Sequence, residues 1–197
     1  MVNTVKFREA SPANLPIPEE GHLVHQAQSG NPEAFAQLYD AYLQRVYRYV
    51  FFRVSDEQTA EDLCSMVFLK AWESLERYQM NGSPFVAWLY TIAHNLVIDH
   101  YRGRKDSVGL DDIVPLASAD EPLDDQVAVT FDLQTMRDVL QILNEEQQQV
   151  LTLRFIADLS TEHIAKIMGK REGAVRALQM RALQMMAKHM QERKCHE

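Results

Sequence analysis

The residues whose types most clearly suggest chemistry lie in the stretch TEHIAKIMGKREGAVRAL, from Thr161 to Leu178. Two short helical patterns flank Gly169, and basic residues crowd the second pattern. Cations of this kind pair with phosphates, and arginine or glutamine side chains can hydrogen-bond to base edges in the major groove. The residues placed for such contacts are Lys170, Arg171, Glu172, Arg176, Gln179 and Arg181.

The spacing within this stretch predicts a helix-turn-helix. Counted from Thr161, Ala165 occupies the fifth position, Gly169 the ninth and Val175 the fifteenth. Closely crossing helices need a small residue at the first of these places, the turn favours a residue that tolerates positive φ, and an apolar residue locks the second helix onto the first. Such a unit presents its second helix to the major groove. An ordinary helical hairpin with a solvated basic face is the alternative that this stretch alone leaves open.

A second group of residues suited to nucleic acid lies in PFVAWLYTIAHNLVIDHYRGRK, residues 84–105. Aromatic side chains beside cations can stack on unpaired bases while the cations hold phosphates. The aliphatic residues of the segment already form a core-facing stripe, which leaves some aromatic residues to lie outside it. The alternative is that all the aromatic residues belong to the core. The residues of interest are Phe85, Trp88, Tyr90, His94, Asn95, Arg102, Arg104 and Lys105.

Helical patterns account for the first half of the chain. A short helix is predicted to end near Gly30, and Asn31-Pro32 then marks the start of the next helix, whose apolar residues recur with helical spacing over 35–50. Ser55 with Gln58 predicts a capping box at the start of a third helix. Ser83-Pro84 predicts the start of the fourth, which ends in the cations at 102–105.

The C-terminal part is helical by the same criteria. Asn144 is predicted to cap a helix, with Gln147 at the capping-box position. Ser160 is predicted to cap the first helix of the helix-turn-helix. After the turn at Gly169, a long helix is expected from about residue 171 to residue 190.

These patterns predict an all-α chain of two small helical domains, the second ending in the helix-turn-helix, joined by a flexible acidic linker. The predicted parts are a disordered tail over 1–18, a first domain over 19–105, the linker over 106–125 and a second domain over 126–197. The linker contains two prolines and seven acidic residues, with no lysine or arginine. It is either a solvated spacer or a segment that imitates nucleic acid by its charge.

The charge is distributed unevenly along the chain. The formal net charge is -8, of which the predicted linker contributes -7, residues 1–105 contribute -2 and residues 126–197 contribute +1. Residues 163–194 carry a net charge of +6, so the predicted helix-turn-helix lies in a locally positive field.

Composition argues against several other classes. Two distant cysteines, Cys64 and Cys195, favour neither a disulfide framework nor a zinc site and fit a reducing cytoplasm. No apolar run reaches the roughly 18 residues of a membrane span, and no signal pattern begins the chain. The histidine pairs at 22 and 25 and at 94 and 100 lack convergent carboxylates, which argues against a helical metalloenzyme. We therefore expect a cytoplasmic protein without a metal, a cofactor or catalytic residues.

Both blocks resemble one family, the small extracytoplasmic-function group of bacterial sigma factors within the sigma-70 family. The first block, LYDAYLQRVYRYV, AEDLCSMVFLKAWESLERY and PFVAWLYTIAHNLVIDHYRGRK, resembles the second conserved region of that family. The second block, LNEEQQQVLTLRFIADLSTEHIAKIMGKREGAVRALQMRALQ, resembles the fourth. The resemblance covers about residues 21–190, with correct order and spacing.

The resemblance implies an initiation factor that binds core RNA polymerase, recognises the -10 and -35 promoter elements and helps to open the duplex. It implies a polymerase-docking surface at Asp62, Phe68 and Trp72, and a loop over 78–85 that receives a flipped base, with Asn81 and Gly82 at its tip. The residues expected at the -10 element are Tyr78, Asn81, Phe85, Trp88, His94, Asn95, Arg102, Arg104 and Lys105. Those expected at the -35 element are Arg154, Lys170, Arg171, Glu172, Arg176, Gln179 and Arg181.

Two further points follow from the resemblance. Ala177, Leu178, Met180 and Leu183 stand on the recognition helix where small polar or basic residues are usual in the family, so the preferred bases stay open. Family members are commonly silenced by an anti-sigma factor, which makes such a partner an expectation here. The alternative to a sigma factor is a stand-alone helix-turn-helix regulator that binds DNA without polymerase.

Overall fold

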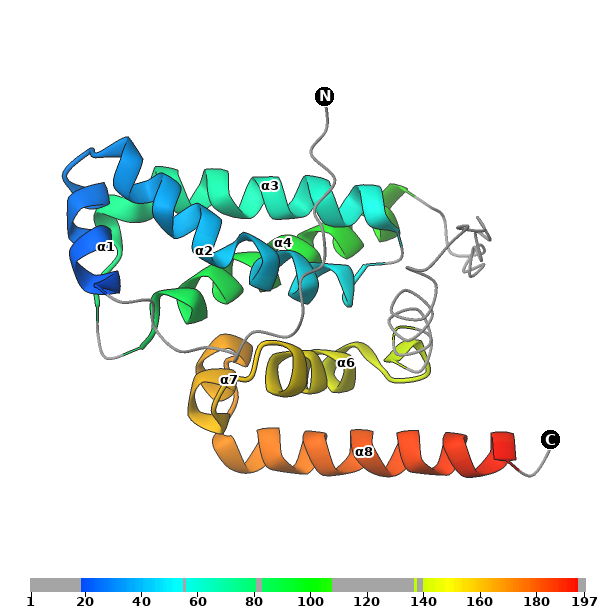
Figure 1. Cartoon of the computed structure of the whole chain (residues 1–197). Coiled ribbons are helices and arrows are strands. Elements are labelled where there is room, and N and C mark those ends of the chain that lie inside the picture. Colours follow the sequence, from blue (N-terminus) through cyan, green and yellow to red (C-terminus); the bar gives the residue numbers. More distant parts are fainter. Residues whose placement is uncertain (1–18, 55, 81–82, 108–136, 138–139, 195–197) are drawn as a thin grey trace, which may run out of the picture.

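The computed structural model describes residues 19–54, 56–80, 83–107, 137 and 140–194 (Figure 1). The first helical group contains α1 (Glu20–Gln28), α2 (Pro32–Phe51), α3 (Glu57–Ser74), the 3-10 helix η1 (Leu75–Arg77) and α4 (Phe85–Ser107). The second contains α6 (Glu145–Leu151), the π-helical turn η2 (Thr152–Ile156), α7 (Thr161–Met168) and α8 (Glu172–Lys194). No strand occurs among the described residues, and the predicted all-α class is confirmed.

Several sequence-based predictions fall on other parts of the chain. The predicted tail, most of the predicted linker, and Asn81 and Gly82 lie outside the described residues. Helix α4 ends at Ser107 and therefore includes the first two residues assigned to the linker. Across the described helices, none combines the length and the apolar character needed to cross a membrane.

Local capping explains most of the helix starts. Asn31 Oδ1 accepts hydrogen bonds from the first turn of α2, with Pro32 in the position where its missing N–H costs nothing. Asn144 and Gln147 form the predicted reciprocal capping box at the start of α6. Ser160 Oγ accepts from His163 N–H at the start of α7. These three predicted caps are confirmed.

The predicted cap of the third helix is one residue off. Asp56, rather than Ser55, is the N-cap of α3, and its Oδ1 accepts a hydrogen bond of 2.7 Å from Thr59 N–H. This interaction holds the pKa of the Asp56 carboxyl below its usual value, mainly through the hydrogen bonds from Thr59. An ionised carboxylate is also favoured by the positive end of the helix dipole, which a serine hydroxyl does not exploit.

The first helical group is built around side chains from α2, α3 and α4. Tyr42, Tyr49 and Val67 are fully buried, and Tyr90 of α4 packs 5.2 Å from the ring of Tyr49. Aromatic pairs in tilted or edge-on arrangements add to the burial of apolar area that holds such cores together. The buried stripe of α4 fixes which of its residues face outward.

The helix-turn-helix of the second group has the predicted geometry. Gly169 ends α7 with φ of 61°, a left-handed conformation that favours glycine. Val175 is fully buried, Ala165 is nearly so, and both lie where α7 and α8 pack together. Helix α6 packs along α8 and completes this core.

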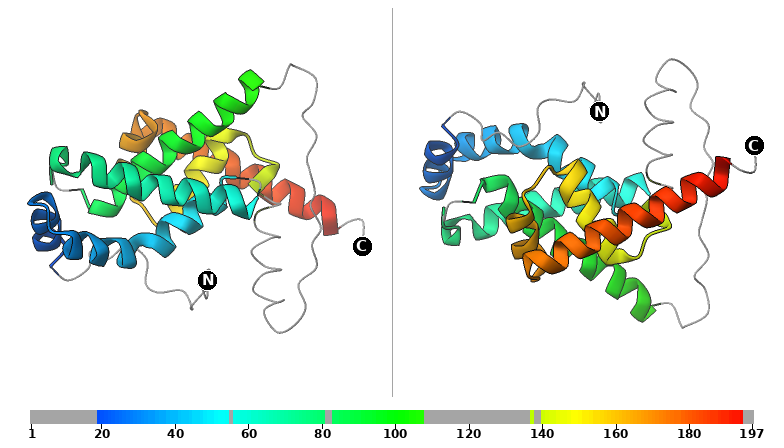
Figure 2. Two further views of the ribbon diagram at one scale, coloured as in Figure 1. Left: turned by 90° about the horizontal axis from the view of Figure 1, so that it is seen from above. Right: turned by 90° about the horizontal axis from the view of Figure 1, so that it is seen from below.

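The two helical groups pack against each other (Figure 2). Helix α7 contacts α4, and η2 contacts α2, so the second group lies beneath α2 and α4 while α3 is on the opposite side (Figure 1). Arg53 Nη1 donates 3.2 Å to the Glu145 carbonyl oxygen, and Arg137 Nε donates 3.1 Å to that of Val54. These bonds link groups whose helices are far apart in the sequence.

Replacing the capping asparagine of α6 tests the local origin of that helix. We expect Asn144→Ala to lower the free energy of unfolding by about 1 kcal/mol, because Gln147 N–H loses its acceptor. Urea denaturation followed by circular dichroism measures the change, with exposed Gln141→Ala as the control. Equal stabilities of the two variants would contradict the assignment.

Candidate nucleic-acid interface

The start of α8 presents a polar surface to solvent. Arg171, Glu172, Arg176 and Arg181 are exposed and Gln179 is half-buried. Val175 and Leu178 face the core instead, so Leu178 does not belong to the outer face of the helix. The outer face of the first turns is therefore rich in groups that can contact phosphates and bases.

Local ion pairs and hydrogen bonds hold several of these side chains. Arg176 pairs with Glu172 at 3.4 Å, and both side chains are exposed. Arg181 Nε donates to the Ala177 carbonyl oxygen. Exposed pairs of this kind contribute little to stability, so they can exchange for contacts with DNA at small cost.

The remaining -35 candidates are less accessible. Lys170 is half-buried and pairs with Glu146 at 2.7 Å. Arg154 Nη1 donates 2.9 Å to the Leu159 carbonyl oxygen and is half-buried. Arg154 also lies within the π-helical turn, a conformation that is rare and often found at functional sites.

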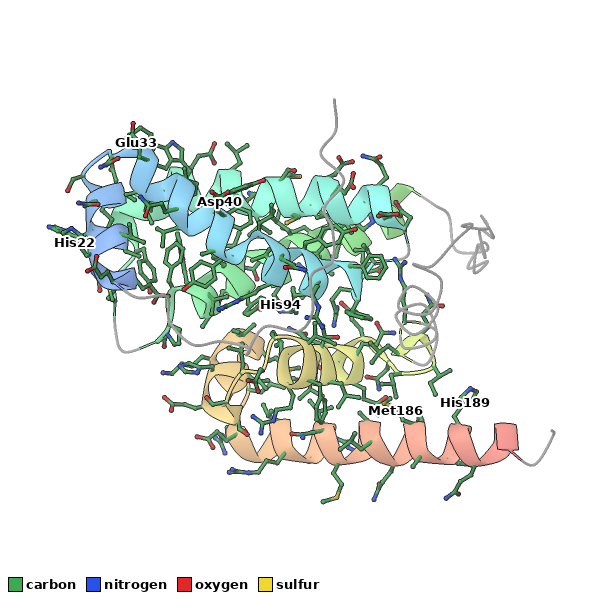
Figure 3. The ribbon with its side chains drawn as sticks, viewed as in Figure 1. His22, Glu33, Asp40, His94, Met186 and His189 are labelled. Atoms are coloured by element: carbon green, nitrogen blue, oxygen red, sulfur yellow. The ribbon has the colours of Figure 1, made fainter. Side chains whose placement is uncertain are left out.

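An apolar surface continues beyond the polar one on α8. Met180, Leu183 and Met185 are exposed, Met180 by 62%. Met186 packs on the core of the second group instead (Figure 3). The exposed side chains could contact thymine methyl groups or a partner protein, but they offer no hydrogen bonds to bases.

The aromatic -10 candidates lie together at the start of α4. The ring of Tyr78 lies 4.7 Å from that of Trp88 and 5.3 Å from that of Phe85. Trp88 and Tyr78 are half-buried, whereas Phe85 is only 1% exposed. Phe85 is therefore a core residue that supports the two outer rings, and the expectation that it contacts DNA directly is not met in this arrangement.

Asn95 is exposed beside a hollow of about 410 Å³ between α3 and α4. Lys70 and Arg77 line the same hollow, and sequence reasoning did not single them out. The signal in the sequence was a pair of cations seven residues, or about two turns, apart near the end of the third predicted helix. Arg102 is also exposed on α4, while Arg104 and Lys105 belong to the helix but their side chains are not described.

His94 lies between the two helical groups (Figure 3). Gln149 Nε2 of α6 donates 2.6 Å to His94 Nδ1, and the imidazole is only 8% exposed. Burial, together with the smaller effect of the nearby charge of Arg53, lowers the pKa of His94 to about 4. The imidazole is therefore neutral and unavailable to DNA in this arrangement.

Helix α7 also lies close to the aromatic residues at the start of α4. A hollow of about 350 Å³ is lined from one side by Tyr78 and Trp88 and from the other by His163, Lys166 and Ile167. The second helical group thus covers part of the surface that carries the -10 candidates.

The predicted polymerase-docking residues lie on α3. Asp62 and Trp72 are exposed, and Trp72 packs edge-on against Phe35 at 4.9 Å. Phe68 is 4% exposed and packs against Tyr39, so it is a core residue rather than a surface for docking. Sequence reasoning missed the exposed Met66 and Leu69.

Met66, Leu69 and Trp72 form an apolar strip along α3, which we call the α3 strip. Their spacing of three residues places them on one side of the helix. In the sequence, the segment of α3 has more apolar residues than one buried stripe needs, and the additional ones form this strip. Clustered exposed apolar side chains are typical of a protein-interaction surface.

Comparison with known proteins shows the same two regions. Residues 38–106 match the family model for Sigma-70 region 2, and residues 139–188 match that for Sigma-70 region 4. The chain is 39% identical over 168 residues to the ECF RNA polymerase sigma factor BldN of Streptomyces coelicolor, covering 84% of this chain and 64% of BldN. It is 34% identical over 169 residues to the ECF RNA polymerase sigma factor SigD of Mycobacterium bovis, covering 82% of this chain and 79% of SigD.

A solved structure shares the fold. The sigma factor RpoE from Bartonella quintana, in complex with the anti-sigma factor NepR, superposes with a TM-score of 0.63 at 24% identity, covering 80% of this chain and 96% of that one. The two family matches and the relatives show the family: the chain belongs to the extracytoplasmic-function RNA polymerase sigma factors of the sigma-70 family.

The buried histidine makes the packing of the two groups sensitive to pH. If they separate, His94 regains water and its usual pKa of 6.5, so the separated form binds more protons than the packed form between pH 6.5 and 4. The packed form is therefore favoured above pH 6.5 and loses stability as the pH falls, by up to about tenfold in equilibrium constant per pH unit. Interdomain fluorescence energy transfer between pH 7.5 and 5 measures the separation.

His94→Asn is the matched variant, because an asparagine does not titrate in this range. We expect this variant to lose most of the pH dependence. A wild-type protein whose energy transfer stays constant over the range, or a variant with unchanged pH dependence, would contradict the assignment.

Proposed function

We propose that this chain is an initiation factor that binds core RNA polymerase, directs it to promoters with -35 and -10 elements and assists opening of the duplex. The observation that carries the proposal is the presence of regions 2 and 4 in one chain, in that order. In this role the protein assists the polymerase and catalyses no reaction itself. The chain matches 64% of the length of BldN, so the activity and partners of a whole sigma factor are proposed for this chain.

In the proposed complex α8 reads the -35 element. The exposed Arg176 and Arg181 and the half-buried Gln179 lie on its first three turns, where a recognition helix meets base edges. Arg171 holds a phosphate near the helix start. Arg154 and Lys170 already have partners in the second helical group and contact the DNA backbone at the margin of the interface.

The -10 element is assigned to α4 and the residues just before it. Tyr78 and Trp88 supply stacking surface for an unpaired base, and stacking of this kind does not depend on the base. Asn95 offers both a donor and an acceptor to a base edge. Lys70 and Arg77 of the hollow, which Glu73 and Asp99 also line, supply cations for the phosphates, as does the exposed Arg102.

The α3 strip is assigned to the polymerase. Exposed apolar side chains bury well against an apolar partner, and Asp62 one turn away adds a charge for orientation. This assignment places the polymerase on α3, which faces away from the second helical group (Figure 2). Docking therefore requires no separation of the two groups.

Binding to the -10 element does require separation. Helix α7 lies against the surface that carries Tyr78 and Trp88, and the His94 ring is hydrogen-bonded to Gln149. We assign to an anti-sigma partner the capacity to hold the two regions in an inactive arrangement. A structural neighbour, RpoE, is in complex with such a protein, NepR.

One pair of measurements separates a sigma factor from a stand-alone regulator. Run-off transcription with core polymerase on a genomic fragment library should yield discrete start sites that share two upstream elements. The free protein, with a net charge of -8, should bind the same fragments poorly. Tight, salt-dependent binding by the free protein without any transcripts would favour the regulator instead.

The -35 assignment predicts the effect of a single arginine. Arg176→Ala should lower the affinity of the polymerase complex for a selected promoter by about tenfold to a hundredfold, the range for one bidentate base contact. Lys188→Ala removes the same charge about 18 Å further along α8 and serves as the control. Filter binding at fixed salt measures both, and equal losses would show a nonspecific charge effect.

The docking assignment predicts a different defect. Leu69→Glu places a charge on the centre of the α3 strip and should weaken binding to core polymerase by about tenfold or more, because the carboxylate is desolvated without a partner. Met180→Glu on α8 is the matched control, since Met180 is also exposed. Fluorescence titration with labelled core measures the affinity, and an unchanged value for Leu69→Glu would overturn the assignment.

A further inference from the structure

Helix α1 contacts both ends of the connection between η1 and α4. At the first end, the carboxamide of Gln28 donates 3.0 Å to the Leu75 carbonyl oxygen and 2.7 Å to that of Tyr78. Both N–H groups of the amide donate, and they link Leu75 in η1 to Tyr78, the residue that follows η1. The direction in which the chain leaves η1 is therefore set by a side chain of α1.

At the second end, a buried carboxylate of α1 meets the start of α4. Glu20 Oε1 accepts 3.1 Å from Phe85 N–H, the first residue of α4, and its other oxygen accepts from the hydroxyl of Tyr42. Glu20 is 7% exposed, so these partners replace the water that it has lost. The Phe85 N–H is one of the donors at the start of a helix that no residue of the helix itself can satisfy.

Further contacts lie between these ends. An added Cβ at Gly21 would lie 3.2 Å from Met80 Cε, which shows how closely α1 approaches the connection. Tyr78 packs on Trp88, and burial together with the charge of Glu20 raises the pKa of Tyr78 to about 12, so its hydroxyl stays protonated. Helix α1 lies before residues 38–106, the part that matches the region 2 model.

We propose that α1 is a positioning element for promoter opening, in which Glu20 and Gln28 hold the two ends of the η1–α4 connection so that Tyr78 and Trp88 stand ready to stack on an unpaired base. The inference rests on the proposed function, because it assigns a role within the -10 interface. Neither residue touches DNA. Both act through the backbone of the connection.

The physical reason is pre-organisation. A stacking pair compensates for the unstacking of a base only if its rings are already in place when the base leaves the duplex. Removing the Glu20 carboxylate leaves the Phe85 N–H buried without an acceptor. Removing the Gln28 carboxamide takes away the bond to the Tyr78 carbonyl oxygen and one of the two bonds to the Leu75 carbonyl oxygen, which still accepts from Tyr78 N–H. In either case the residues at one end of the connection, Tyr78 or Phe85, gain freedom that binding of the flipped base must then remove.

The experiment uses the full chain with core polymerase on a promoter taken from the run-off selection. Permanganate reactivity of thymines in the -10 region gives the rate of opening on duplex DNA. Run-off transcription is measured on the same promoter with a preformed mismatch bubble. Glu20→Ala and Gln28→Ala should slow opening of the duplex by about tenfold, the cost of one buried charged or paired hydrogen bond. On the bubble, where the bases are already unpaired, transcription should stay near the wild-type level.

Three controls separate positioning from loss of fold. Glu20→Gln keeps an oxygen that can accept from Phe85 N–H and should restore most of the rate. His25→Ala alters an exposed residue of the same helix and should behave as wild type. The fluorescence of Trp88, read from the free protein in a Trp72→Phe background, should change in Gln28→Ala and Glu20→Ala. With Trp72 intact, the two alanine variants should keep the wild-type affinity for core polymerase.

Each outcome decides the matter. Wild-type opening by both alanine variants overturns the inference, and so does an equal defect on duplex and bubble, which marks a general structural role. If Glu20→Ala does not fold, Gln28→Ala, at a half-buried position, carries the same test. A wild-type protein that opens no promoter with core polymerase refutes the proposed function itself.

Discussion

The packing of α4 against α2, α3 and α7 is the constraint on which the candidate interface depends. Leu89, Tyr90 and Val97 bury one side of the helix, and this sets its rotation about its own axis. A residue next to the buried stripe on the sequence differs from it by about 100° around the helix. Asn95 therefore faces solvent while Leu96 faces the core, and no local change can exchange them without breaking the core.

The same helix carries part of the proposed -10 surface and also contacts the second helical group. In this arrangement a ring nitrogen of His94 accepts a hydrogen bond from Gln149, and α7 lies against the residues at the start of α4. The contact between the groups uses polar bonds such as those of Arg53 and Arg137 as well as apolar packing. Polar interfaces of this kind are typical of parts that move relative to each other, because each side can be satisfied by water or another partner.

The aromatic residues before and within α4 divide into a support and a surface. Phe85 is buried beneath Tyr78 and Trp88, and α1 fixes the backbone on both sides of them. The buried Glu20 carboxylate contributes to this arrangement, because each of its oxygens needs a hydrogen-bond donor in place of water. One of those donors is the start of α4. The stability of the core and the geometry of the proposed -10 surface are thus coupled.

Much of the fold is decided by interactions between residues close in sequence. Asn31, Asn144 and Ser160 cap helices through backbone groups two or three residues away, and Gly169 ends α7 through its own φ, so the sequence alone predicts them. Ser55 and Asp56 are adjacent and both are residue types that cap helices, so the sequence alone did not decide which of them caps α3. The all-α class and the helix-turn-helix follow from the same local rules and from the helical spacing of apolar residues.

The roles of individual side chains at the interface were decided only by tertiary packing. Composition could not show that Phe85 is core and Trp88 is half-exposed, because both lie on the first turn of one helix. Phe85 N–H meets Glu20 across 65 residues, and His94 meets Gln149 across 55. A cap is set by a few torsion angles, whereas such meetings depend on how whole helices pack, and that is a property of the complete core rather than of any stretch of sequence.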